Sequence, residues 1–367
     1  MEGGVRELIH RLAEGRSLTL DGYEALLAGR DEEADALLAD LAVKARREIY
    51  GDAVYVRGLI EIGNVCRNDC LYCGIRRSNA ACARYRLGPE EILSCAGEGW
   101  ALGFRTFVLQ GGEDPSFTDE LLCSVVGEIK ARCPGCAVTL SLGERSRESY
   151  ARLREAGADR YLLRHETADR DHYARLHPPE MSFDERMRCL RDLRELGYQV
   201  GCGLMVGSPF QTVSCLAKDL ELIGTFRPDM CGVGPFIPHR GTPFRGEPPG
   251  PLELTCCLLS IIRLIHPPVL LPATTALGTI HAAGREMGIR AGANVVMPNL
   301  TPPGAREKYD LYDGKTTAGA DLARGLDELA RRIRSVGCEP VMGRGDVARL
   351  DRPDLCYHKA ALEGPTI

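Results

Sequence analysis

Three cysteines stand close together in the segment NVCRNDCLYCGIRR, residues 64–77. Cys66, Cys70 and Cys73 have the spacing CxxxCxxC, and closely spaced thiolates bind zinc or an iron–sulfur cluster. A structural zinc site uses four cysteine or histidine ligands, and no nearby histidine completes that number. A four-iron, four-sulfur cluster held by three cysteines keeps one iron open, which suits an enzyme whose substrate or cofactor binds the cluster.

The remaining cysteines do not form a second obvious site. The chain has 16 cysteines in 367 residues, and at this length, without a secretory signal, a disulfide scaffold is a poor interpretation. Cys133 and Cys136 form a CxxC in a turn before a strand, and a metal or redox role for this pair is disfavoured.

Composition excludes several classes of protein. With 46 basic and 51 acidic residues, no global field would draw the protein to nucleic acid. No apolar run of about 18 residues predicts a membrane span. The N-terminal sequence MEGGVRELIHRLAEG has an amphipathic helical pattern and lacks the apolar region of a secretory signal. A cytoplasmic protein is therefore expected.

The elements that must position the cysteines follow a repeating order. Residues 1–50 read as helices, and after Gly51 short apolar runs alternate with amphipathic segments. The strand candidates are 56–63, 105–111, 137–142, 160–166, 199–207, 229–236, 269–276 and 294–300. Eight such repeats predict an α/β fold, a (β/α)8 TIM-type barrel at 51–310, with an N-terminal helical segment at 1–50 and a C-terminal extension at 311–367 packed on the barrel.

Local signals mark the ends of several helices. Ser182 and Glu185 form a capping-box pattern at a helix start, and Gly103, Gly157 and Gly197 each close a helix just before a strand. In a barrel of this type the chemistry belongs at the C-terminal ends of the strands, where the cysteine loop and most of the unusual polar residues are expected.

A CxxxCxxC loop after the first strand, with aromatic Tyr72 before its last cysteine, resembles the signature of the radical S-adenosylmethionine (SAM) enzymes. The resemblance implies that the amino and carboxylate groups of SAM chelate the open iron. An electron from the cluster then cleaves SAM to give a 5′-deoxyadenosyl radical. The SAM-binding residues implied by the resemblance are Tyr72, Gly111, Gly112, Glu113, Glu166, Arg186 and, along the adenine, Met205 in GLMVGSP.

Longer blocks are more specific. VLQGGEDP, TLSLGE, DRYLLRHET, GPFIPH, PATTALGT and GANVVMPN are together similar to the HydE family of FeFe-hydrogenase maturases, from about residue 50 to residue 315. The resemblance implies assembly of the hydrogenase di-iron subcluster. The implied substrate is iron carrying two CO, one cyanide and a cysteine, delivered by the maturase HydG. The adenosyl radical would attack the sulfur of that cysteine.

The same resemblance implies partners and a substrate cavity. The product would pass to the scaffold maturase HydF, and a ferredoxin or flavodoxin would supply electrons. Arginines suit a carboxylate or an anionic complex, and threonine hydroxyls suit cyanide or carboxylate; ordinary strand-end or packing roles are the alternatives. The candidate substrate residues are Arg57, Thr139, Arg164, Thr274, Thr275, Met297, Tyr309 and Tyr312.

Two sequence features limit the number of clusters. Biotin synthases hold a second cluster with cysteines on inner strands, where this chain has Val108, Ala137 and Gly201. After residue 300 only Cys338 and Cys356 remain, so a single cluster is predicted. The fragment DGKT lacks the upstream glycines of a phosphate loop and is discounted.

Two other functions stay open. A methylornithine synthase-like enzyme would act on the carbon skeleton of an amino acid, and the threonine pair with Arg57 does not exclude that. A non-catalytic iron–sulfur electron carrier belongs to a different class, and four-cysteine ligation would be expected of it.

Overall fold

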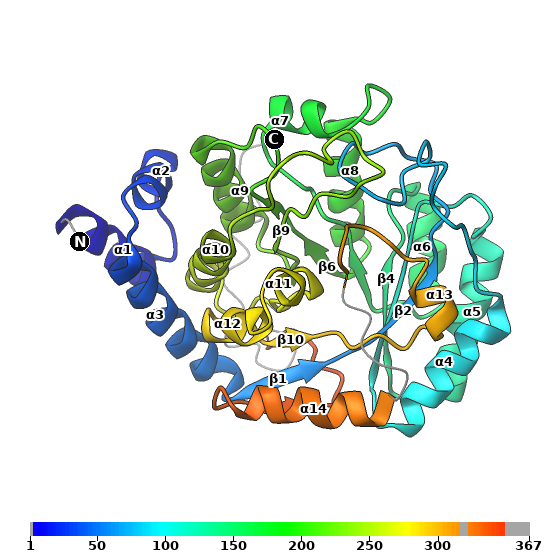
Figure 1. The fold of residues 1–367 in the computed structure, drawn as a ribbon. Helices are drawn as coiled ribbons and strands as arrows, with labels where there is room; N and C mark the ends of the chain where they lie inside the picture. The colour runs from blue at the N-terminus through cyan, green and yellow to red at the C-terminus, as the bar shows by residue number, and fades with distance from the viewer. Residues whose placement is uncertain (1–2, 316–321, 349–367) are drawn as a thin grey trace.

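Six parallel strands form the largest sheet of the computed structural model, which describes residues 3–315 and 322–348. Each strand pairs with the next in the order β2-β3-β4-β5-β6-β8, and helices surround the sheet (Figure 1). The strands are β2 (Gly58–Gly63), β3 (Thr106–Gly111), β4 (Ala137–Ser141), β5 (Arg160–Leu162), β6 (Gln199–Cys202) and β8 (Met230–Cys231). Each lies within a run that the sequence predicts as a strand.

Isolated bridges close this sheet into a barrel. Strand β8 bridges to Leu270, Pro272 bridges to β10 (Val295–Val296), and Asn299 bridges back to β2, all in parallel. The closed barrel therefore has eight strand positions, and the predicted (β/α)8 TIM-type barrel is confirmed. The seventh strand position is joined to its neighbours only by isolated bridges. Pro272 lies within it and has no backbone N–H to donate.

Two predicted strands are interrupted in the structure. The fifth and sixth each break at a glycine, Gly203 and Gly232, because the two backbones approach closely there. A Cβ atom on Gly203 would lie 2.1 Å from the carbonyl oxygen of Gly232, so no larger residue fits. Beyond the breaks β7 (Met205–Val206) pairs with β9 (Gly234–Pro235), which carries the chain toward the site.

Two short strands were not predicted. Strand β1 (Ala53–Val56) precedes β2 and pairs with β10 on one side and with β11 (Glu339–Val341) on the other. The following residues, 342–348, pass under the barrel, where a Cβ atom on Gly345 would lie 2.6 Å from Tyr55. The N-terminal ends of the strands are here called the base. They are closed by residues 342–348, here called the base segment.

The helical signals agree with the structure except for one half of the capping box, because the Glu185 carboxylate pairs with Arg188. Ser182 accepts a hydrogen bond from the Glu185 N–H, and Gly103, Gly157 and Gly197 have positive φ. The helices after β2 are α4 (Pro89–Ala101), α5 (Asp119–Arg132), α6 (Arg147–Glu155), α7 (Arg170–Leu176), α8 (Phe183–Glu195), α9 (Val213–Phe226), α10 (Leu252–Ile265), α11 (Thr275–Ile280), α12 (Gly284–Arg290), α13 (Pro303–Arg306) and α14 (Leu322–Arg334).

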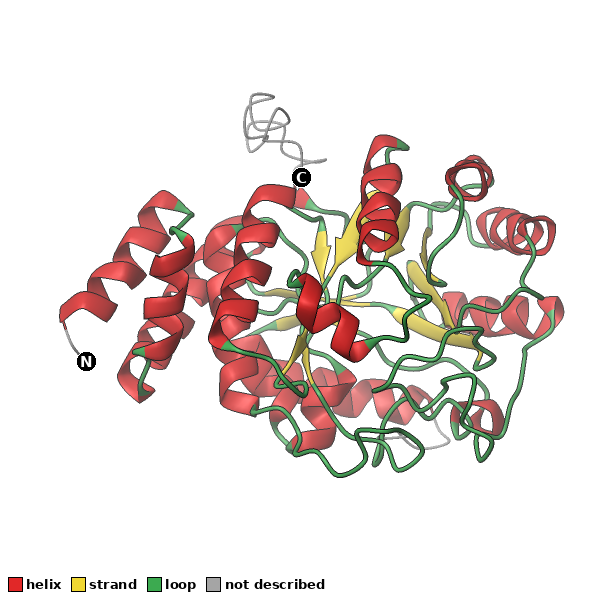
Figure 2. Ribbon diagram, turned by 90° about the horizontal axis from the view of Figure 1, so that it is seen from above, coloured by secondary structure: helices red, strands yellow, loops and turns green. Residues whose placement is uncertain are grey.

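The N-terminal segment forms three helices beside the barrel (Figure 2). They are α1 (Gly3–Gly15), α2 (Leu20–Ala28) and α3 (Glu32–Tyr50). Helix α2 packs on α9 and α3 packs on α10, so the segment covers the flank of the barrel. None of the helices in the described residues combines the length and apolar character needed to cross a membrane.

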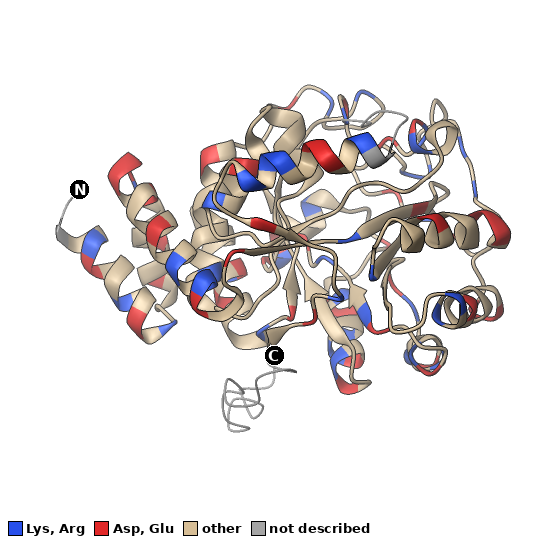
Figure 3. Cartoon of the chain, turned by 90° about the horizontal axis from the view of Figure 1, so that it is seen from below, with Lys and Arg blue, Asp and Glu red and all other residues tan. Residues whose placement is uncertain are grey.

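Charged residues lie mainly on the helices (Figure 3). Helix α14 ends in three arginines, Arg331, Arg332 and Arg334, and Arg332 pairs with Glu286 of α12. This pair holds α14 against the barrel, on the side of β1 and β11 (Figure 1).

Candidate functional site

The three motif cysteines lie in the loop between β2 and α4, at the C-terminal end of the barrel, here called the mouth. Cys66, Cys70 and Cys73 are half-buried free thiols. Within the described residues the only set of three or more His, Cys, Asp and Glu ligand atoms that all lie within 4.8 Å of one another is elsewhere, so these sulfurs are more widely spaced. A single zinc with bonds of about 2.3 Å would bring its sulfurs to roughly 3.8 Å. The spacing disfavours a single zinc bound by all three sulfurs.

The chemistry of the donor set fits a cluster. Burial, followed by the neighbouring Cys66, raises the pKa of Cys73 to about 12. Burial likewise raises the pKa of Cys66 and, with Cys73, raises that of Cys70 well above its ordinary value. Such thiols stay protonated at neutral pH until a bound cation ionises them. The iron of a cluster supplies that charge.

Asp69 braces the cysteine loop from within. Its carboxylate accepts hydrogen bonds of 2.8 and 2.6 Å from the guanidinium of Arg76, and others from the backbone and hydroxyl of Ser78. These bonds hold the pKa of Asp69 well below its usual range. The Leu71 N–H donates to the carbonyl of Leu176 at the end of α7, so α7 supports the loop from outside.

Tyr72, which directly precedes Cys73, is held by α7. Burial lowers the pKa of His177 to about 3, so its ring is neutral. Its Nδ1 lies 2.9 Å from the Tyr173 carbonyl, an acceptor, and therefore carries the hydrogen. The Tyr72 hydroxyl then donates to Nε2 at 3.2 Å. Met205 packs against Tyr72 in a small apolar cluster, which brings two predicted SAM residues together.

The glycines after β3 allow a close approach of the cysteine loop. A Cβ atom on Gly112 would lie 2.3 Å from the carbonyl oxygen of Val65, so only glycine fits there. Gly111 pairs with Gly63 of β2. The two glycines therefore lie beside the loop, as the predicted SAM role requires.

The Glu113 carboxylate already has partners. Oε2 lies 3.1 Å from Arg67 Nε, and Oε1 accepts a 2.9 Å hydrogen bond from the Glu144 N–H. These three residues line an open pocket of about 610 Å³ at the rim of the barrel. In this structure the side chain links three loops, and its predicted contact with SAM stays a prediction.

Glu166 and Arg164 follow β5 and lie together at the mouth. Glu166 has a left-handed φ of +68°, a conformation rare outside glycine and asparagine that marks functional sites. Its Oε2 is 3.0 Å from Arg164 Nη2 but makes no hydrogen bond. The Glu166 carboxylate therefore keeps an acceptor available, which its predicted role of holding ribose hydroxyls needs.

Arg186, on α8, reaches the same place. Its Nε donates to Glu144 at 2.5 Å and its Nη1 to the carbonyl of Arg164 at 2.5 Å. Burial alone would lower the pKa of Arg186, but the neighbouring Tyr173 and Glu144 raise it, so the guanidinium stays charged. Arg186 thus offers a fixed positive charge beside the cysteine loop. Sequence reasoning missed Glu144, although it closes the quoted block TLSLGE.

Several polar atoms in the barrel interior are buried without a hydrogen-bond partner. Unpartnered buried polar atoms are rare and costly in folded proteins, yet several of these belong to predicted site residues. They are Arg57 Nε, Thr139 Oγ1, Arg164 Nε, Glu166 Oε2 and Thr274 Oγ1. These atoms are therefore available to hydrogen-bond a guest.

The other predicted substrate residues lie around this interior. Thr275 is the first residue of α11, directly after Thr274. Met297 packs against an apolar cluster that contains Met230 and Val347. Tyr312 is half-buried, and burial raises its pKa to about 12, so its phenol is neutral.

Tyr309 is held by partners that the sequence did not indicate. Its hydroxyl accepts a 3.2 Å hydrogen bond from Gln110 at the end of β3. Lys315 Nζ donates 2.8 Å to the Tyr309 carbonyl, lies 4.5 Å from its ring centroid and pairs with Glu61 of β2 at 2.5 Å. Asn299 donates to the other oxygen of Glu61. The lysine of the discounted DGKT fragment is thus part of the barrel mouth.

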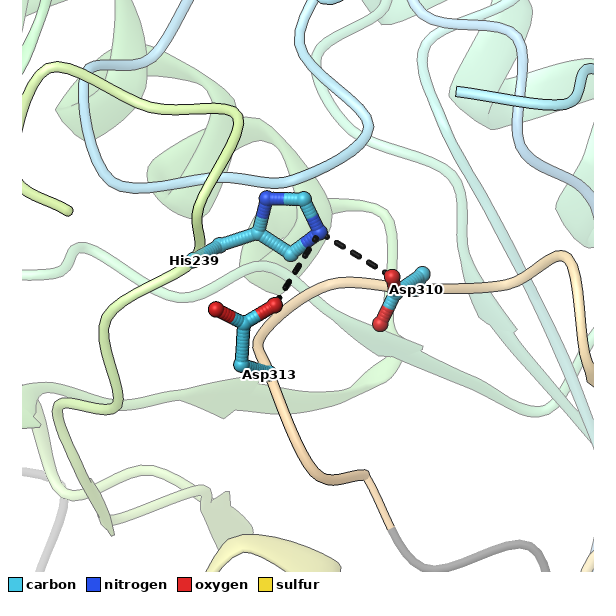
Figure 4. A group of neighbouring side chains, drawn as sticks. All are labelled: His239, Asp310 and Asp313. Carbon is cyan, nitrogen blue, oxygen red and sulfur yellow. Dashed lines mark hydrogen bonds and ion pairs between the residues drawn. The ribbon is translucent and has the colours of Figure 1, made fainter. Parts of the chain in front are cut away.

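A histidine and two aspartates join the Tyr309 segment to the loop after β9 (Figure 4). His239 Nε2 lies 3.1 Å from Asp310 and 3.8 Å from Asp313. Its Nδ1 accepts a hydrogen bond from the Gly241 N–H, so Nε2 carries the hydrogen and points at the carboxylates. A metal would need a lone pair on Nε2, which here carries the hydrogen. The group is therefore better described as a set of ion-paired side chains that joins the two segments. It packs against Gly74, beside Cys73.

Comparisons with known proteins define the class first. The family model described as the radical SAM superfamily matches residues 60–223, which span the cysteine loop and strands β3 to β7. The chain is also 47% identical over 310 residues to the [FeFe] hydrogenase maturase subunit HydE of Thermotoga maritima, covering 84% of this chain and 88% of the relative. The protein belongs to the HydE family of FeFe-hydrogenase maturases and is a radical SAM enzyme.

More distant relatives share the architecture. The 3-methylornithine synthase of Methanosarcina acetivorans is 29% identical over 332 residues, covering 90% of this chain and 92% of the relative. A crystal structure of methylornithine synthase has a TM-score of 0.80 with 27% identity, covering 91% of this chain and 97% of that one. A structure of HydG has a TM-score of 0.78 with 22% identity, covering 96% and 79%, and shows the fold alone.

Proposed function

We propose that this enzyme builds the di-iron subcluster of FeFe-hydrogenase by radical attack on an iron-bound cysteine. A single four-iron, four-sulfur cluster would be held by Cys66, Cys70 and Cys73. When bound, the cluster would supply one electron to SAM, whose cleavage gives the 5′-deoxyadenosyl radical. The proposed target is the cysteine sulfur of an iron complex with two CO and one cyanide.

The unpartnered polar atoms of the barrel mouth carry this proposal. An anionic iron complex with a cysteine carboxylate and a cyanide presents hydrogen-bond acceptors. Arg164 offers a free Nε and Thr139 and Thr274 offer free hydroxyls. Arg57 lies deeper, where its Nη2 donates to Gly345 of the base segment at 3.1 Å. A guest that extended to Arg57 would have its other end close to the cysteine loop.

The SAM-binding part of the proposal rests on a second group of side chains. Tyr72 and Met205 would flank the adenine, Glu166 would accept from the ribose hydroxyls, and Arg186 would bind the carboxylate. Gly111, Gly112 and Glu113 would receive the amino group through their backbone and the Glu113 carboxylate. Gly111 is the last residue of β3, Met205 is the first of β7, and the others lie in loops or on α8.

Other predicted substrate roles belong to the wall of the cavity. Thr275 would add a hydroxyl beside Thr274, and Met297 would give an apolar contact. Tyr309 and Tyr312 would close the side opposite the strands, held in place by the Lys315–Glu61 pair.

One cluster is proposed because Cys338, the C-terminal cysteine within the described residues, is too buried to bind a second cluster. Cys338 is 2% exposed, and its sulfur accepts a 3.2 Å hydrogen bond from Arg46 of α3. Cys356 lies outside the described residues. The proposal includes HydG as the source of the iron complex, HydF as the acceptor and a ferredoxin or flavodoxin as reductant. It also includes a cytoplasmic location, which the free thiols of the described residues support.

A second candidate is a synthase that acts on an amino-acid skeleton. The similarity to 3-methylornithine synthase covers most of both chains. Arg57 and the threonine hydroxyls would bind the carboxylate and amine of lysine as readily as those of cysteine. The two candidates differ in which compound stimulates SAM cleavage, because a radical enzyme couples cleavage to its own substrate.

The decisive experiment measures 5′-deoxyadenosine under anaerobic conditions. The cluster is reconstituted and reduced with dithionite, SAM is added, and formation is compared with no addition, with lysine and with the HydG-derived iron–cysteine complex. We expect strong stimulation by the complex alone. Stimulation by lysine instead would replace the proposal with the synthase, and no cleavage by cluster-loaded protein would support an electron carrier.

Matched cysteine variants separate the motif from its surroundings. Cys70→Ala removes a proposed cluster ligand and is expected to abolish cleavage and most of the bound iron. Cys82→Ala changes the next cysteine of the same loop, which is half-buried and lies 3.6 Å from the Asn64 amide. It is expected to keep both the iron and the activity.

A further inference from the structure

The hydroxyl of Tyr173, on α7, is a buried polar group without a partner. The residue is 1% exposed, and its oxygen makes no hydrogen bond. A buried tyrosine hydroxyl is normally hydrogen-bonded. Sequence analysis gave this residue no role, because a tyrosine in a short amphipathic helix is ordinarily a packing residue.

The ring cannot readily turn to find a partner elsewhere. It stacks on His177 with centroids 3.9 Å apart and planes at 25°, and its other contact is the edge of Phe183 at 5.6 Å. His177 in turn donates to the Tyr173 carbonyl and accepts from Tyr72. The unpartnered hydroxyl is therefore held in one place by the same helix that supports the cysteine loop.

The surroundings of the hydroxyl favour an anionic guest. The guanidinium carbon of Arg186 lies 6.0 Å from the ring centroid, and Arg186 is the proposed partner of the SAM carboxylate. Burial raises the pKa of Tyr173 and outweighs the opposing charge of Arg186. The phenol thus remains a neutral donor at neutral pH.

We propose that Tyr173 is a further SAM-binding residue, whose hydroxyl donates a hydrogen bond to the methionine carboxylate beside Arg186. The inference rests on the proposed binding of SAM at this site and adds a residue to it. A carboxylate accepts hydrogen bonds and cannot donate, so it matches a donor that has no other partner. Arg186 would supply the charge and Tyr173 the direction.

The test uses a pair of tyrosine-to-phenylalanine variants with opposite expectations. Tyr173→Phe removes an unpartnered hydroxyl and keeps the ring that stacks on His177. Tyr198 lies just before β6 and far along the chain from the cysteine loop. Tyr198→Phe removes a hydroxyl that donates a 2.7 Å hydrogen bond to the carbonyl of Tyr150. Each variant is loaded with cluster, and SAM affinity is measured by anaerobic titration calorimetry. The melting temperature is measured without SAM.

We expect Tyr173→Phe to bind SAM about tenfold or more weakly, as for one lost hydrogen bond to a charged group, while its melting temperature stays the same or rises. Tyr198→Phe should melt earlier and bind SAM as the wild type does. Unchanged SAM affinity in Tyr173→Phe would overturn the inference, and so would a melting temperature that falls as far as that of Tyr198→Phe.

The same data separate this inference from the proposed function. If the wild type binds SAM and Tyr173→Phe does so weakly, the inference stands even when the iron complex fails to stimulate cleavage. If cluster-loaded wild type does not bind SAM at all, both the inference and the proposed function fall.

Discussion

Arg160 and Arg164 lie four residues apart, one at the base of the barrel and the other at the mouth. At the base Arg160 is fully buried and donates to the side chains of Gln199, Thr106 and Asp346 and to the carbonyl of Arg344. At the mouth Arg164 leaves its Nε buried and unpartnered. The guanidinium donors of Arg160 are thus hydrogen-bonded at the base, whereas one of those of Arg164 has no partner at the mouth.

The contrast teaches where the fold stores stability and where it holds capacity for a guest. A satisfied buried network strengthens a fold, whereas each unpartnered buried atom costs about 1–3 kcal/mol. At the base Arg344 and Asp346 supply partners of Arg160 from within the chain, although the Nε of Arg57 beside them stays unpartnered. At the mouth Arg164 and Thr274 lack such partners, as does Thr139 in the middle of β4, and we infer that bound ligands provide them.

The largest effect is expected from Arg160→Met at the base. The change leaves the carboxylate of Asp346, at 2.6 Å from Arg160, without one of its two arginine partners. Loss of one member of a buried pair costs about 3–5 kcal/mol, so the free energy of unfolding in urea should fall by that order. Arg191→Met, on the outer face of α8, is the control and should change it little. A drop in SAM affinity in the protein that remains folded would contradict the division between base and mouth.

The next prediction concerns acid sensitivity at the mouth. The pKa of His177 is lowered by burial to about 3, whereas an exposed histidine has about 6.5. Below pH 6.5 the unfolded chain binds a proton that the folded protein refuses, so stability is lost as the pH falls toward 3. One such group changes the free energy of unfolding by at most about 1.4 kcal/mol per pH unit.

Comparison with His177→Gln isolates this group, because the other histidines titrate alike in both proteins. Unfolding in urea at pH 7 and at pH 5 should show a smaller loss in the variant than in the wild type. Equal losses would mean that His177 takes up a proton in the folded protein, and the hydrogen bond from Tyr72 would then be assigned wrongly.

The base should become acid-sensitive only at lower pH. Burial would raise the pKa of Asp346, but hydrogen bonds from Arg344 and the charge of Arg160 outweigh it and hold the pKa well below its ordinary value. A depressed carboxyl pKa contributes stability above the unfolded value of about 3.9, and that stability is lost as the pH falls below it. In Asp346→Asn this part of the pH dependence should vanish, while the dependence between pH 7 and 5 remains.

Sequence patterns located the strands and the cysteine loop because both depend on residues near one another in the chain. Apolar runs bounded by glycine give the strands, and the CxxxCxxC spacing gives the loop. The base segment gave no such signal. Strand β11 has three residues, one of them Pro340, and its partner β1 lies more than 280 residues earlier, so no local pattern links the two.

The site shows the same limit. Tyr72 and Arg186 could be named from the resemblance, and the structure brings them to one end of the barrel. His177, which holds Tyr72, could not be found, because a lone histidine on a short helix has no characteristic spacing. Lys315 and Glu61 are 254 residues apart, and only the folded chain shows that they pair.

The smallest effects come from one substitution made at two threonines of neighbouring strands, one at the base and the other in the barrel interior. Thr106, at the base, donates 2.7 Å to the carbonyl of Arg344 and accepts from Arg160. Thr139, on the neighbouring strand, is 2% exposed and its hydroxyl has no partner. Thr106→Val should lower the free energy of unfolding by about 1 kcal/mol, and Thr139→Val should leave it unchanged or raise it slightly.

Activity should respond in the reverse order. Thr139→Val removes a proposed contact with the iron–cysteine complex, so complex-stimulated formation of 5′-deoxyadenosine should fall about tenfold, the equivalent of one hydrogen bond. Thr106→Val should keep the wild-type rate in the folded protein. If both variants lost stability and kept activity, Thr139 would be an ordinary packing residue. The contrast between base and mouth would then rest on the unpartnered atoms of Arg164 and Glu166.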